Sequence, residues 1–214
     1  MSKIIAIMLL LCCGMMLFGC ADDNGRRKAE QQKTIVVTDS VGRKVELPYP
    51  LERVAVCNVY NAELITAVGA IDKIVGVDNY IFKDQSGFKN RFNEAQVFGI
   101  SQNAMNYEKL AELAPQAVII TGEGTWRDAQ EMLDRFGIKV IVINSYYTDQ
   151  FADNCRLIGR IFGREEQAEE LVNYFNDKLA YIQKQLQGVP RRSLYFEYRT
   201  LGKTAVPGDY FYKM

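Results

Sequence analysis

The feature that most constrains the fold is a repeated unit in which a short apolar segment is followed by a helical one. Four segments rich in Val, Ile and Ala have the composition of buried β-strands: residues 53–57, 73–77, 117–121 and 139–144. Helical patterns lie between and after them, at residues 61–68, 107–113, 126–136 and 150–162. Apolar strands that alternate with helices are typical of a parallel sheet covered on both faces. The sequence therefore predicts an α/β lobe with a parallel sheet, spanning residues 34–163.

Two further segments flank this repeat. Residues 35–38 and 44–47 are short β patterns on either side of a turn-rich connection, which predicts an antiparallel hairpin at the edge of the fold. Residues 78–103 have no clear period, and we expect an irregular segment there with one short helix.

A long amphipathic helix is predicted over residues 164–187. Its apolar residues recur at steps of three and four: Ala168, Leu171, Val172, Phe175, Leu179, Ile182 and Leu186. Carboxylates at Glu165 and Glu166 favour the helix start, and Gly188 and Pro190 end it. The helix is either a surface helix of one domain or a link between two lobes. A predicted strand at residues 193–198 favours a linking helix, residues 164–188, that leads into the beginning of a C-terminal lobe, residues 189–214.

The N-terminus has the pattern of an export signal. Lys3 precedes an apolar run, residues 4–18, that is too short to span a membrane comfortably. The run ends in Gly19 and Cys20, which resemble a bacterial lipobox and imply a lipoprotein signal peptide, residues 1–20, with the lipid on Cys20. An uncleaved anchor is the alternative. Both place the rest of the chain outside the cytoplasm on a bacterial membrane, with residues 21–33 as a flexible tether.

Cysteine usage leaves one pairing open. The signal peptide accounts for Cys12 and Cys13 and the lipid for Cys20, so two of the five cysteines remain, Cys57 and Cys155. They could form a disulfide in an exported protein. The apolar face of the predicted helix around Cys155 favours core packing instead.

Composition excludes several kinds of chemistry. Lys and Arg total 26, Asp and Glu also total 26, and no basic run is present, which argues against nucleic acid as a partner. The chain has no His, which removes His-based catalytic triads and zinc sites, and no metal site is predicted. Gly122 and Gly124 follow a strand, but the third Gly of a dinucleotide-binding motif is missing and Glu123 would repel a pyrophosphate. We therefore expect neither an enzyme nor a bound cofactor.

A ligand site is predicted at one edge of the sheet. In open parallel sheets, ligands bind at the loops that leave the C-terminal ends of the strands, here residues 58–61, 78–82, 121–126 and 144–147. These loops supply aromatic faces and amide groups: Tyr60, Tyr80, Trp126, Tyr146, Tyr147, Asn58, Asn61 and Asn79. The alternative for each tyrosine is that it only covers the surface of the lobe.

An ordered set of short stretches resembles one known family. They include residues 53–56, 61–64, 68–70, 74–77, 98–99, 107–120, 136–140 and 204–208. Taken together, in this order and at this spacing, they resemble the substrate-binding proteins of ABC importers for iron–siderophore complexes, haem and vitamin B12. The resemblance covers roughly residues 34–214.

The resemblance implies two α/β lobes joined by one long helix, a ligand held in the cleft, and a monomer that meets an ABC importer permease. It implies that a metal arrives as a chelate: a ferric siderophore first, then cobalamin or haem. Tyr198 and Arg199 would contribute from the second lobe, where Arg suits a carboxylate or catecholate group. Direct iron ligation by Tyr146 and Tyr147 stays an alternative.

The family also implies acidic residues that dock on the permease, and Glu123 or Asp128 is expected in that role. Because the sequence ends at Met214, soon after the predicted second lobe begins, a second function stays open. An exported lobe that has lost transport would act as a sensor or adaptor, or would have no function.

Overall fold

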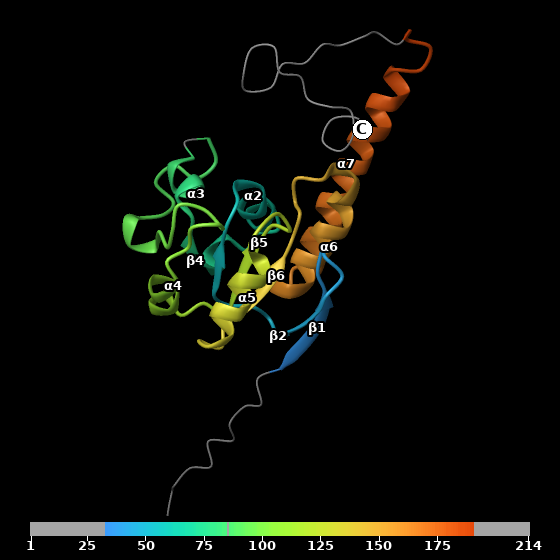
Figure 1. Ribbon diagram of the computed structural model, residues 1–214. Coiled ribbons are helices and arrows are strands. Elements are labelled where there is room, and N and C mark those ends of the chain that lie inside the picture. Colours follow the sequence, from blue (N-terminus) through green and yellow to red (C-terminus); the bar gives the residue numbers. More distant parts are fainter. Residues whose placement is uncertain (1–32, 85, 191–214) are drawn as a thin grey trace, which may run out of the picture. The chain divides into compact units, whose positions relative to one another are not determined.

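The computed structural model describes residues 33–84 and 86–190 (Figure 1). Cys20, Tyr198 and Arg199 lie outside these ranges, as do residues 1–32 and 191–214. The signal peptide, nearly all of the tether and the second lobe therefore stay predictions. Within the described ranges, no helix is both long enough and apolar enough to cross a bilayer.

A four-stranded parallel sheet forms the centre of the lobe. Its strands are β3 (Val54–Val56), β4 (Ile74–Val77), β5 (Ala117–Ile120) and β6 (Lys139–Val142), arranged in the order β4-β3-β5-β6. All three pairings are parallel, with Val54 opposite both Ile74 and Ala117. The predicted α/β fold with a parallel sheet is confirmed.

Helices cover both faces of this sheet (Figure 1). On one face lie α2 (Val59–Ala67), α3 (Asn79–Lys83), α6 (Phe151–Phe162) and α7 (Glu165–Gln185). On the other lie α4 (Tyr107–Leu113) and α5 (Trp126–Asp134). Within residues 33–84 and 86–190, three single-turn 3-10 helices complete the connections, η1 (Ile71–Lys73), η2 (Glu94–Gln96) and η3 (Thr148–Gln150). Successive strand residues point to opposite faces, so β3, β5 and β6 each contribute to two buried apolar clusters, whereas β4 contributes Ile74 and Val77 to one of them.

The two remaining cysteines are separated by the sheet. Cys57 belongs to the cluster beneath α4 and α5, whereas Cys155 belongs to the cluster beneath α6. Both thiols are buried and unpaired. Core packing of Cys155, which its helical pattern predicted, is therefore confirmed.

Helix α7 is buried along only part of its length. Ala168 and Val172 are buried against α6, and the ring of Phe175 stacks on Phe151 with 4.1 Å between centroids. A Cβ at Gly159 would lie 2.5 Å from the Cβ of Ala168, so only glycine allows the two helices to approach this closely. Farther along, Ile182 is 50% exposed and Leu186 is 58% exposed. The predicted apolar stripe exists, and Ile182 and Leu186 at its C-terminal end stay exposed among the described residues.

The predicted hairpin is formed by β1 (Thr34–Thr38) and β2 (Lys44–Pro48), which pair only with each other in the part of the chain that the structure describes. Its turn is organised by the carboxylate of Asp39, which is buried. Asp39 accepts hydrogen bonds from the backbone N–H groups of Val41 and Arg43, at 3.2 and 2.9 Å. The guanidinium of Arg43 also pairs with this carboxylate, at 2.6 Å.

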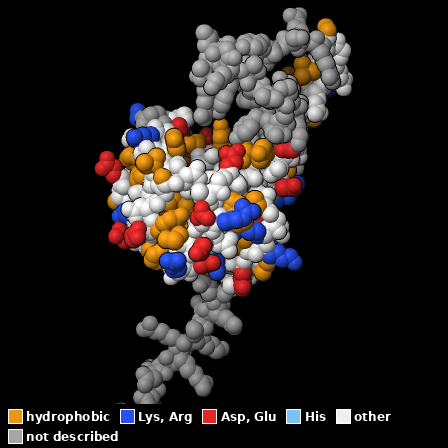
Figure 2. Space-filling model, in the orientation of Figure 1, with side chains coloured by type: hydrophobic (Ala, Val, Ile, Leu, Met, Phe, Trp, Pro, Cys, Tyr) orange, Lys and Arg blue, Asp and Glu red, His pale blue; other side chains and the backbone are white. Residues whose placement is uncertain are grey.

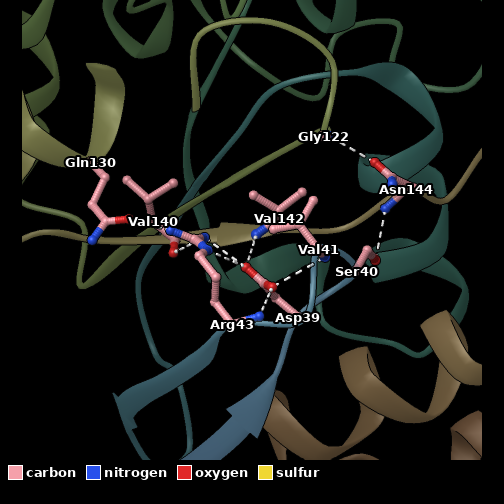
Figure 3. Close-up of polar contacts among 9 residues, drawn as sticks. All are labelled: Asp39, Ser40, Val41, Arg43, Gly122, Gln130, Val140, Val142 and Asn144. Atoms are coloured by element: carbon pink, nitrogen blue, oxygen red, sulfur yellow. Dashed lines mark hydrogen bonds and ion pairs between the residues drawn. The ribbon is translucent and has the colours of Figure 1, made fainter. Parts of the chain in front are cut away.

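The same turn occupies the free edge of β6 (Figure 3). The backbone N–H of Val142 donates to Asp39, and its carbonyl accepts from the backbone N–H of Ser40 at 2.9 Å. Arg43 donates to the carbonyl of Val140 at 3.1 Å and also to the side chain of Gln130 in α5. An edge strand otherwise leaves its backbone groups unpaired. The turn supplies hydrogen-bond partners to β6 that a further strand would otherwise provide.

We predict that Asp39→Asn lowers the free energy of unfolding by about 2–3 kcal/mol, because it leaves Arg43 without its charged partner. The expected loss is below that of a fully buried pair, since the Arg43 side chain is 20% exposed. The control is Thr34→Val, which removes an exposed hydrogen bond to Glu46 in the same hairpin and should cost no more than about 0.5 kcal/mol. Urea denaturation measures both, and equal losses would contradict the role given to Asp39.

Candidate ligand-binding site

The C-terminal ends of the four strands meet at one edge of the sheet, and a cavity of about 470 Å³ lies there. Its lining comes from loops that follow three different strands and from the segment 101–103. The side chains that line it from these loops include Asn58, Tyr60, Asp78, Tyr80, Thr121 and Glu123. The cavity therefore occupies the position that the strand order predicted for a ligand.

Asn58 and Asp78 tie the first two loops together. Asn58, at a positive φ of 78°, caps α2 by accepting a hydrogen bond from the N–H of Tyr60 at 2.9 Å. Its own N–H donates to Asp78 at 3.0 Å, and Asp78 also caps α3 by accepting from the N–H of Ile81 at 3.0 Å. Asp78 is only 2% exposed; burial raises its pKa, and these N–H groups oppose that rise. Tyr60 and Tyr80 line the same cavity and stay exposed.

Gln102 connects the segment 101–103 to the loop after β5, and together they form a second wall of the cavity. Its Oε1 accepts hydrogen bonds from the N–H of Thr121 at 2.9 Å and from the hydroxyl of Thr121 at 2.8 Å. Its Nε2 donates to the carbonyl of Glu123. Gly124, at a φ of 84°, lets the two segments approach, since a Cβ there would lie 2.7 Å from Oδ1 of Asn103. The side chain of Gln102 thus fixes the loop that carries Glu123.

Asn144 connects this wall to the hairpin turn (Figure 3). Its Oδ1 accepts a hydrogen bond from the N–H of Gly122 at 2.7 Å, and its own N–H donates to the hydroxyl oxygen of Ser40 at 3.1 Å. The position of the loop after β5 therefore depends on residues more than 80 positions earlier in the chain.

Tyr146 is hydrogen-bonded to Glu123 of the cavity lining, and Tyr147 contacts the ring of Tyr146. The hydroxyl of Tyr146 donates to Oε1 of Glu123 at 3.1 Å, and the two tyrosine rings lie 4.3 Å apart between centroids. Burial, followed by hydrogen bonds to Tyr147 and Glu123, raises the pKa of Tyr146 well above its ordinary value. Direct iron ligation by Tyr146 and Tyr147 stays a prediction.

Besides Tyr146 and Tyr147, three predicted ligand residues do not line the cavity. Asn61 is fully buried in the first turn of α2, where its amide donates to the carbonyl of Cys57 and its oxygen accepts from Ser145. Asn79 donates its backbone N–H to the carbonyl of Gly99. The ring of Trp126 is in contact with two guanidinium groups, Arg43 at 4.3 Å and Arg127 at 4.1 Å from its centroid. These three residues support the walls.

Several residues that line the cavity were not predicted from the sequence. Asp78 and Thr121 begin loops that were identified, but neither was chosen as a ligand residue. Ser101, Gln102 and Asn103 come from the stretch without a period, where only their polarity offered a signal. Of the two expected docking residues, Glu123 lines the cavity and Asp128 is exposed in the first turn of α5.

Other features of the lobe bear on the site. Among the described residues, no three His, Cys, Asp or Glu side chains gather in a way that could hold a metal ion.

Acidic and basic side chains are interspersed over the face shown in Figure 2, as the balanced composition leads one to expect. A second cavity of about 430 Å³ lies beside the hairpin and is lined by Arg43, Lys44, Gln130 and Asp134 among others.

We predict that Gln102→Leu lowers the free energy of unfolding by about 1–3 kcal/mol, because it removes the partners of Thr121 and of the Glu123 carbonyl. Hydrogen exchange should also accelerate at the Thr121 amide. The control, Gln96→Leu, breaks an exposed capping bond to Asn93 and should leave Thr121 protected. Unchanged exchange at Thr121 in Gln102→Leu would show that this side chain does not fix the wall.

Comparisons with known proteins place this site in context. The model of the periplasmic binding protein family matches residues 54–213. The similar solved structures include a periplasmic solute binding protein from Veillonella parvula, with 28% identity and a TM-score of 0.60; the match covers 75% of this chain and 50% of that one. No curated protein matched the chain.

Two further structures share the fold at lower identity. Staphylococcus aureus SirA complexed with staphyloferrin B is 20% identical, with a TM-score of 0.59, and the match covers 72% of this chain and 51% of SirA. MolA, the molybdate periplasmic binding protein of a Haemophilus influenzae ABC transporter, is 20% identical, with a TM-score of 0.64 and coverage of 73% and 55%. The chain thus spans about half the length of the structures that it matches. Because the family model covers most of the sequence, the chain belongs to the periplasmic binding protein family.

Proposed function

We propose that the chain provides the N-terminal lobe and linking helix of an extracytoplasmic solute-binding protein that captures a metal chelate for an ABC importer. The observation that carries this proposal is the polar, tyrosine-rimmed cavity at the carboxyl ends of the parallel strands. Family membership supports an extracytoplasmic location and solute binding. The likeness to MolA, which serves an ABC transporter, supports an importer as the partner.

The proposed ligand is a ferric siderophore, followed by cobalamin and haem. Large chelates present flat apolar faces and peripheral polar groups, which exposed aromatic rings and a few fixed polar groups suit. Tyr60 and Tyr80 are 51% and 63% exposed at the cavity, beside the amide of Asn58. A chain without His offers no imidazole for a bare transition metal, so the metal would arrive already chelated. SirA, whose structure was solved with staphyloferrin B, shares this fold.

The rest of the proposed architecture extends from α7. Its exposed apolar residues Ile182 and Leu186 are suited to packing against a second lobe that begins at residue 189. Tyr198 and Arg199 would complete the cleft from that lobe. Residues 1–19 would be cleaved off with the signal peptide, Cys20 would become the first residue and carry the lipid, and residues 21–33 would tether a monomer to the membrane.

For docking on the permease, we propose Asp128, with Glu123 as the second candidate. Asp128 is exposed on the first turn of α5 and close to Arg127. Glu123 is also exposed, but its carboxylate accepts a hydrogen bond from Tyr146 at the cavity. Of the two, Asp128 is therefore the more available to a basic group of a partner.

We predict that the full chain binds a ferric siderophore in calorimetric titration, and that Tyr80→Ala weakens binding about tenfold. The reason is that the ring would lose buried apolar contact worth roughly 1–2 kcal/mol. The matched control is Tyr174→Ala, because this tyrosine on α7 is as exposed as Tyr80 but lies outside the cavity. Equal effects of the two variants would contradict the site. No binding of ferric siderophores, cobalamin or haem would favour the alternative of an exported lobe without transport.

A further inference from the structure

The cavity has an unbalanced set of charges. Among the described residues that line it, the charged side chains are Asp78 and Glu123, and no Lys or Arg is present. The two carboxylates come from different loops, after β4 and after β5 respectively. The remaining polar lining consists of amides and hydroxyls, such as Asn58, Gln102 and Thr121.

Two guanidinium groups of neighbouring elements have partners outside the cavity lining. The guanidinium of Arg43 pairs with Asp39 and lies over the ring of Trp126. Arg127 lies over the same ring. Lys83, at the end of α3, is not among the lining residues. The two carboxylates in the cavity therefore have no neighbouring guanidinium among the described contacts that would offset their charge for a ligand.

Both carboxylates are held in place by hydrogen-bond donors. Asp78 accepts from two backbone N–H groups, those of Asn58 and Ile81, which are contacts that suit a charged carboxylate. Glu123 accepts from the hydroxyl of Tyr146, while its backbone carbonyl accepts from Gln102. A ligand that enters the cavity thus meets the carboxylate of Glu123 at the rim, while the carboxylate of Asp78 in the lining is nearly buried and its two oxygens already accept backbone N–H groups.

This arrangement distinguishes between classes of chelate. A ferric ion held by three hydroxamates carries no net charge, whereas the same ion held by three catecholates is strongly anionic. An anionic chelate in the cavity would be repelled by the charges of Asp78 and Glu123. In a partly desolvated site, this repulsion weakens binding substantially. A neutral chelate avoids this repulsion, and one that carries an ammonium group gains an attraction.

We propose that this half of the site selects neutral or cationic chelates, with ferric hydroxamates as the fitting class, and that Glu123 is a specificity-determining residue. The inference rests on the proposed chelate-binding function and adds a ligand class to it. Glu123 discriminates by its charge, so its contribution appears in the ratio of affinities for anionic and neutral chelates.

The test compares ferric trihydroxamate and ferric triscatecholate chelates in calorimetric titrations of the full chain. We expect the hydroxamate to bind at least about tenfold more tightly at low salt. Glu123→Gln, which keeps an oxygen for Tyr146 and removes the charge, should reduce that ratio about fivefold. The control is Glu131→Gln, an exposed position on α5 outside the cavity lining, which should leave the ratio unchanged.

The outcomes separate this inference from the function on which it rests. Equal or tighter binding of the catecholate by the wild-type chain overturns the selection of neutral chelates and leaves chelate capture intact. A ratio that Glu123→Gln does not change overturns the role of Glu123. If neither chelate binds, and cobalamin and haem do not bind either, the proposed function itself fails and the inference fails with it.

Discussion

The arrangement of the lobe depends on the ion pair between Asp39 and Arg43. Through it, a hairpin that pairs with no other strand holds the free edge of β6, because the same carboxylate accepts the N–H of Val142. Ser40, in the same turn, then accepts the N–H of Asn144, and Asn144 holds the loop after β5 by the N–H of Gly122. A buried interaction at one side of the sheet is thus connected by hydrogen bonds to the wall of the cavity.

The chemistry of the cavity follows from how its loops satisfy their own polar groups. Gln102 takes up the donors of Thr121, and Asn58 is used in the cap of α2. The groups left to meet a ligand are mainly the rings of Tyr60 and Tyr80 and the carboxylate of Glu123, while Asp78 contributes a nearly buried charge to the lining. A site built in this way offers apolar faces and negative charge, which is why we assign it to a chelate that is large and not anionic.

The sequence predicted the features that depend on local pattern. The parallel strands, the hairpin and the long helix could all be read from apolar spacing, and Tyr60 and Tyr80 from their position just after strands. Asn61 is different because α2 begins at Val59, which places Asn61 inside the helix and turns its side chain into the core. The placement of Trp126 depends on Arg43, 83 residues earlier in the chain, and such a contact leaves no local pattern. The segment with Gln102 had no period to interpret, so its part in the wall could only be seen in three dimensions.

The central claim is that the cavity at the strand ends is where a chelate binds, and nuclear magnetic resonance tests it most directly. Titrating the isotope-labelled full chain with a gallium trihydroxamate, a diamagnetic stand-in for the ferric complex, should shift the amide signals of Asn58, Asp78, Tyr80 and Gln102. The second cavity, beside the hairpin, has a similar volume of about 430 Å³ and serves as an internal control. Shifts confined to Lys44 and Gln130 at that cavity, or no shifts at all, would contradict the account.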